Sequence, residues 1–88
     1  MAGHSVISPE VLARYAADAA AEVPGVHTKQ RRGARFVGDE VEVHVVVDYG
    51  AEIPAVAAQV QLRVADYLGR MAGVTPSAVQ VVVDDVVR

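Results

Sequence analysis

The stretch that decides the fold, residues 40–49, reads EVEVHVVVDY. Four of its valines alternate with other residues: Val41, Val43, Val45 and Val47. Successive side chains of a β-strand point to opposite faces of a sheet, so this alternation predicts a strand that buries one face. The alternation returns in residues 79–83, which read VQVVV, and a second long strand is therefore expected there.

Two segments around these strands have helical spacing of apolar residues. The first begins with Ser8 as N-cap and Pro9 at the first helical position, and it ends at Pro24-Gly25. The second begins near Ile53-Pro54 and ends at Gly73, which can adopt the left-handed C-cap conformation. We expect its core stripe to comprise Ile53, Val56, Ala57, Val60, Val64, Tyr67, Leu68 and Met71.

Gly38-Asp39 is expected to form a two-residue hairpin turn with glycine first, which suits a type II′ turn. The resulting register pairs Phe36 with Val41 on the core side. On the other side it forms two cross-strand pairs of opposite charge, Arg35 with Glu42 and Lys29 with Asp48. In this register Arg32 either extends past the sheet edge, or Gly33 forms a bulge that shifts the pairing.

The predicted order α-β-β-α-β gives an α/β chain of the α+β type, a single domain over residues 1–88. A right-handed crossover places the last strand parallel to the second, and the polar first strand lies at an edge. The result is a two-layer, three-stranded mixed sheet with both helices on one face, in a type II KH-like arrangement. The open face is expected to carry Glu40, Glu42, His44, Val46, Asp48, Gln80, Val82, Asp84 and Val86.

The composition narrows the class of protein. The chain has 88 residues, a formal net charge of −3 and no cysteine. A negative charge disfavours a nucleic-acid partner, and the lack of cysteine excludes disulfides and thiolate metal sites. We see no signal peptide in the first residues, and no apolar run approaches the roughly 20 residues that span a bilayer. The expectation is a cytoplasmic protein without direct membrane insertion.

The residue types that serve catalysis and metal binding form no convincing group. In the register above His27 lies about 20 Å from His44, too far to share one metal ion. Ser5, Ser8 and Ser77 fall at a terminus, a helix cap and a connector, and the predicted register brings no histidine into a catalytic arrangement with them. Paired acids occur, but Glu40 and Glu42 share the exposed face, while Asp84 and Asp85 are expected on opposite faces. The prediction is therefore no enzyme, no cofactor and no metal site.

Two surfaces are candidate binding sites. The outer side of the second helix carries small residues around one leucine, which would let another helix approach: Ala55, Ala58, Leu62, Ala65 and Gly69. The alternative is that alanine simply favours a solvent-exposed helix. The second surface is a basic edge strand that would bind RNA in a KH-like manner: Lys29, Arg31, Arg32 and Arg35. KH recognition needs a GxxG loop. Neither Gly33 with Gly38 nor Gly69 with Gly73 has that spacing.

An ordered set of phrases resembles the bacterial alkaline-shock/general-stress family, also called envelope stress response proteins. The phrases are ISPEVL at residues 7–12, EVPGV at 22–26, VVVDYG at 45–50, IPAVA at 53–57, QVQ at 59–61, MAG at 71–73 and VQVVVDDV at 79–86. They cover nearly the whole chain. The sequence departs at Ala72, where threonine is common in the family.

The resemblance implies a non-enzymatic cytoplasmic scaffold of the envelope stress response. Some relatives self-assemble and are held beneath the membrane by a small membrane-anchored partner. For this chain the resemblance therefore implies binding to itself and to such a partner, at the inner face of the membrane. The family resemblance implies no catalytic residues. The alternative function is the KH-like RNA-binding domain described above.

Overall fold

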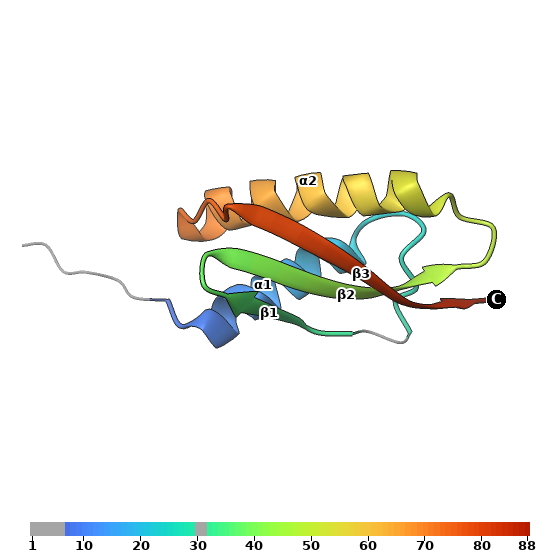
Figure 1. Ribbon diagram of the computed structural model, residues 1–88, viewed down its shortest axis with the longest axis horizontal. Coiled ribbons are helices and arrows are strands. Elements are labelled where there is room, and N and C mark those ends of the chain that lie inside the picture. Colours follow the sequence, from blue (N-terminus) through green and yellow to red (C-terminus); the bar gives the residue numbers. More distant parts are fainter. Residues whose placement is uncertain (1–6, 30–31) are drawn as a thin grey trace, which may run out of the picture.

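The computed structural model describes residues 7–29 and 32–88. The candidate residues Ser5 and Arg31 lie outside them. The elements follow the expected order and are α1 Pro9–Ala21, β1 Ala34–Val37, β2 Glu40–Asp48, α2 Ile53–Ala72 and β3 Ala78–Val87 (Figure 1).

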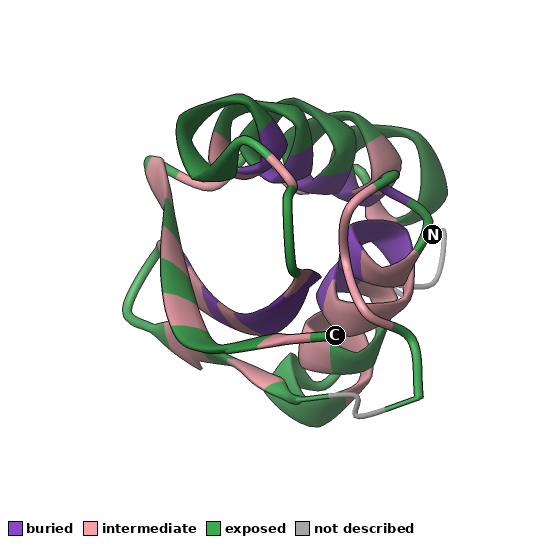
Figure 2. Ribbon diagram, turned by 90° about the vertical axis from the view of Figure 1, so that its right-hand side faces the viewer, coloured by how far each residue is buried: buried purple, intermediate pink, exposed green. Residues whose placement is uncertain are grey.

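The helices and the sheet form two layers. The sheet has the order β1-β2-β3, with β1 antiparallel and β3 parallel to β2. α1 packs against β1, β2 and α2, while α2 also packs against β3. Figure 2 shows that the buried sides of the helices and of the central strand face one another. The α+β class, the mixed sheet and the edge position of β1 are therefore confirmed.

The β1–β2 hairpin has the predicted register. Phe36 pairs with Val41, and Arg35 pairs with Glu42. Gly38 has a φ of 63°, whereas no non-glycine residue described in the chain has a positive φ. Positive φ at the first turn residue alone defines a type II′ turn, whose twist matches that of the flanking strands.

The predicted pairing of Lys29 with Asp48 is wrong. The hairpin register continues to Gly33, whose carbonyl accepts a hydrogen bond from the His44 amide at 3.0 Å. The next bridge joins Val26 to Val47. The pairing between β2 and the chain before β1 is therefore shifted by several residues relative to the hairpin register. His27, not Lys29, bonds to the Asp48 carboxylate, at 2.8 Å.

A β-bulge in β3 overturns a second expectation. Val45 pairs with Val83, but Val46 pairs with Asp85, so Asp84 is the extra residue. Paired residues of neighbouring strands share a face, and Asp85 therefore takes an open-face position beside Asp84 instead of the opposite face. The same shift aligns Val86 with Val47 on the core side. Val46 is 1% exposed and does not lie open to solvent as predicted.

Valine and alanine build the core between the two layers. Val41, Val43, Val45 and Val47 of β2 are at most 2% exposed. Most of the predicted α2 stripe is correct, and the residues that are buried are Val56, Val60, Val64 and Leu68. The prediction that the two end residues of this stripe are buried is wrong, since Ile53 is 39% exposed and Met71 is 54% exposed. The rings of Tyr15 and Tyr67 meet in a T-shaped arrangement between the two helices, with centroids 6.0 Å apart.

The connection after α1 depends on Gly25. Ser8 caps the start of α1 by accepting a bond from the Val11 amide at 3.3 Å, as predicted. The helix ends at Ala21, before the predicted Pro24-Gly25. Gly25 follows with a φ of 98°, and a Cβ at this position would lie 2.8 Å from Cγ2 of Val56. Both the backbone conformation and the contact with α2 exclude a side chain there.

Gly25→Ala should lower the free energy of unfolding by about 1–3 kcal/mol, because it adds backbone strain and a clash with Val56. Chemical denaturation followed by circular dichroism measures the change. Gly33→Ala is the matched control, since no atom lies within 4 Å of its added Cβ. Equal stability of Gly25→Ala and the wild type would contradict this role of Gly25.

Candidate interaction surfaces

The outer side of α2 is exposed along its length. The five predicted positions, called here the outer stripe, are all exposed to solvent: Ala55, Ala58, Leu62, Ala65 and Gly69. Leu62 lies at their centre and is 67% exposed. The buried residues of α2 lie on its opposite side, facing the sheet. The structure thus places the stripe as expected, and its role as an interface stays a prediction.

The predicted basic cluster is only partly a free cationic surface. Lys29 is exposed, and Arg31 lies outside the described residues. Arg32 extends across the open face and its Nε lies 3.7 Å from Oδ2 of Asp84. The Nη2 of Arg35 donates to Oε1 of Glu42 at 3.4 Å. RNA phosphates would have to compete with these two carboxylates, so the geometry does not favour the RNA-binding alternative.

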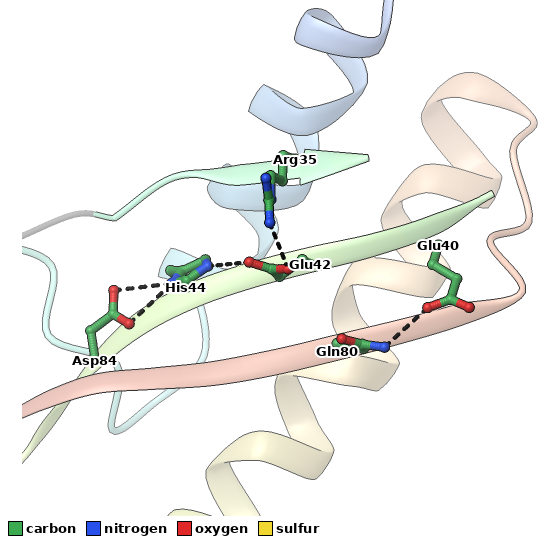
Figure 3. Close-up of polar contacts among 6 residues, drawn as sticks. All are labelled: Arg35, Glu40, Glu42, His44, Gln80 and Asp84. Atoms are coloured by element: carbon green, nitrogen blue, oxygen red, sulfur yellow. Dashed lines mark hydrogen bonds and ion pairs between the residues drawn. The ribbon is translucent and has the colours of Figure 1, made fainter. Parts of the chain in front are cut away.

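A polar network joins all three strands on the open face (Figure 3). His44 of β2 lies between two carboxylates. Its Nε2 is 2.5 Å from Oε2 of Glu42, and its Nδ1 is 3.0 Å from Oδ1 of Asp84. Arg35 and Arg32 extend the chain of contacts at its two ends. We call these five residues the open-face network.

The geometry of the network favours a protonated imidazole. A neutral histidine carries one N–H, so one of its ring nitrogens would face a carboxylate oxygen without a proton between them. The hydrogen bond with Asp84, and then that with Glu42, raise the pKa of His44 above its ordinary value of 6.5. The hydrogen bond with His44, followed by that with Arg35, lowers the pKa of Glu42 below 4.5. The charged pair links β2 to β3.

The raised pKa of His44 and the lowered pKa of Glu42 together predict a limited pH range of greatest stability. Because the pKa of His44 is raised on folding, its stabilisation is complete below pH 6.5 and is lost as the pH rises through the folded value. Because the pKa of Glu42 is lowered, its stabilisation is present above pH 4.5 and is lost as the pH falls through the folded value.

We expect His44→Gln to flatten the decline in thermal midpoint between about pH 6 and pH 9. Differential scanning calorimetry at constant ionic strength measures this decline. Glu40→Gln is the control, because Glu40 accepts a bond from Gln80 at 3.0 Å on the same face but does not contact His44. An identical alkaline decline in His44→Gln and wild type would show that His44 does not couple the strands.

His27 and His44 are closer together than the sequence predicted. The register has shifted before β1, and the His27 amide donates to the carbonyl of Val46, two residues from His44 along β2. The predicted separation of about 20 Å assumed a continuous strand and does not apply. Within residues 7–29 and 32–88, no three histidine, aspartate or glutamate side chains are grouped to hold a metal ion.

The two described serines have structural contacts. Ser8 caps α1, and the Ser77 hydroxyl lies 3.5 Å from the carbonyl of Asp39, at the turn between β1 and β2. The amide of Ser77 donates to the same carbonyl at 2.9 Å. These bonds position the start of β3 beside the start of β2.

Sequence reasoning missed the His44–Asp84 contact. Both residues were assigned to the open face, and His44 pairs with Val82, two residues before Asp84 in β3. The bulge brings Asp84 within reach of the imidazole. The adjacent acids Asp84 and Asp85 interrupt the alternation of valines, and this interruption was the available signal.

Comparison with known protein families gives one match, which covers residues 37–88 and so includes the hairpin turn, β2, α2 and β3. No curated protein and no solved structure matches the chain. The type II KH-like arrangement therefore stays a prediction. In the part of the chain that the structure describes, no helix has the length and apolar character needed to cross a membrane.

The matched family is that of alkaline shock protein 23, described as having a cell envelope-related function. The match covers more than half of the chain and agrees with the resemblance drawn from its phrases. The chain belongs to this alkaline-shock family of proteins with a cell envelope-related function.

Proposed function

We propose that this chain is a non-enzymatic scaffold module of the cell envelope that binds a second copy of itself through the outer stripe of α2. The observation that carries the proposal is Leu62, a large apolar side chain left 67% exposed at the centre of the stripe. Folding does not use this side of α2, since the core contacts of the helix lie opposite. A monomer that served no partner would gain solubility from a charged residue at this position.

The spacing of the stripe fits helix-on-helix packing. Its positions are three and four residues apart in alternation, as in the a and d positions of a coiled-coil seam. Alanine and glycine around one leucine allow the axes of two helices to come close, and Leu62 can then insert between small residues of the other copy. The 20 residues of α2 provide room for more than two such repeats.

The family's cell envelope-related function supports a place for the module near the membrane. We propose that it works in the cytoplasm and is held at the inner face of the membrane by a small membrane-anchored protein. Self-association would then give an array of copies beneath the membrane. Binding to the anchored protein and binding between copies are separate contacts, and each has its own test.

Leu62→Arg should abolish self-association without unfolding the chain. An arginine at the centre of the seam places a charge opposite its own copy, where burial is costly. Sedimentation velocity over a range of concentrations measures the mass distribution, and circular dichroism checks the fold. Met71→Arg is the matched control, since Met71 is also an exposed apolar residue of α2 but lies off the stripe.

Three outcomes would contradict the proposal. A wild-type chain that stays monomeric at every concentration would remove the basis for self-association. Equal association of Leu62→Arg and wild type would show that association uses another surface. Equal loss in Met71→Arg would show that added positive charge, rather than the position on the stripe, prevents association.

A further inference from the structure

A groove of about 450 Å³ runs between α1 and β1. α1 contributes Ala13, Arg14 and Ala17, and the edge strand contributes Ala34, Arg35 and Phe36. Its volume lies in the range of about 300–1,000 Å³ that is typical of ligand sites. The small side chains of Ala13 and Ala17 on α1 leave room for the groove beside the edge of the sheet.

The free edge of β1 borders this groove. In an antiparallel pair, residues that exchange hydrogen bonds alternate with residues whose N–H and C=O point away from the partner strand. Gly33 bonds to His44, so Gly33, Arg35 and Val37 face β2 in this way. Ala34 and Phe36 therefore direct their N–H and C=O groups outward. Their side chains point to the helix layer, since their partners Val43 and Val41 belong to the core.

The outward N–H and C=O groups of Ala34 and Phe36 thus lie beside the apolar lining of the groove. An extended peptide beside β1 would pair with Ala34 and Phe36, and every second side chain of the peptide would enter the groove under α1. A small apolar ligand would leave the outward N–H and C=O groups unused. The combination points to a peptide rather than to a lipid or metabolite.

The charges at the groove select the kind of peptide. Arg14 and Arg35 line it, and Glu10 is the one acid in its lining. The side chain of Arg35 is 70% exposed, which leaves its guanidinium open to a second carboxylate besides Glu42. Arg32 follows on the same edge, so the edge is basic although the chain as a whole carries a formal charge of −3. Acidic side chains opposite Arg35 would form favourable cross-strand pairs.

We propose that the groove between α1 and β1 binds an extended peptide segment of a partner protein, which adds a strand to β1. The peptide alternates apolar side chains, which enter the groove, with acidic side chains, which meet Arg35 and Arg32 on the open face. This contact does not involve the outer stripe of α2, so it holds whether or not the chain self-associates.

The test starts with a phage-displayed library of random peptides selected on the full chain. The most enriched peptide is synthesised with a fluorescent label and its binding is measured by anisotropy. Ala34→Pro removes only an outward-facing N–H, a substitution that edge strands tolerate. Ala13→Phe fills the groove from α1. Each should weaken binding by about tenfold or more, and Arg35→Glu should weaken binding of acidic peptides most.

Thr75→Phe is the control, because it adds the same ring at an exposed residue that lies outside both the groove and the outer stripe. Circular dichroism confirms that each variant is folded, and the two groove variants act through different elements, so failure of one to fold leaves the other. The proposal is overturned if no peptide is enriched, or if enriched peptides bind both groove variants as tightly as wild type. It is also overturned if the only species bound at β1 is a second copy of the chain.

Discussion

The burial of one face of β2 is the constraint on which the rest of the structure depends. β2 is the central strand, and its valines at positions 41, 43, 45 and 47 lie under both helices. Full burial of each such side chain stabilises the fold by about 1.5–3 kcal/mol. α1 and α2 meet this surface with alanines and valines, so the interior is filled. No polar side chain is buried within the described residues, and the chemistry of this module therefore lies on its surface.

The sequence predicts elements well where one periodicity dominates and where a turn fixes the register. Val41 to Val47 and the Gly38-Asp39 turn together leave one pairing of β1 with β2, and the structure has it. Prediction fails where no periodicity exists. Residues 26–33 contain no alternation of apolar side chains, and the pairing of Lys29 with Asp48 was wrong because the segment leaves the ladder after His27.

The surfaces differ in how far the sequence reveals them. The outer stripe of α2 follows from helical spacing alone, because its positions are fixed once the helix and its buried side are known. The open-face network needs the bulge at Asp84, a local feature that strand alternation does not include. The groove depends on how α1 lies across β1, which is set by packing between layers. No spacing within either element could have predicted it.

Site-specific photo-crosslinking in the native host can test whether this module binds other proteins through the outer stripe of α2 and through the groove between α1 and β1. The crosslinker is placed at Leu62 on the outer stripe, at Arg14 on the groove, and at Thr75, an exposed residue of the connector before β3. The account predicts an adduct of twice the chain's mass from position 62, an adduct with a different protein from position 14, and none from position 75. Absence of adducts at both surfaces, or equal adducts at all three positions, would contradict it.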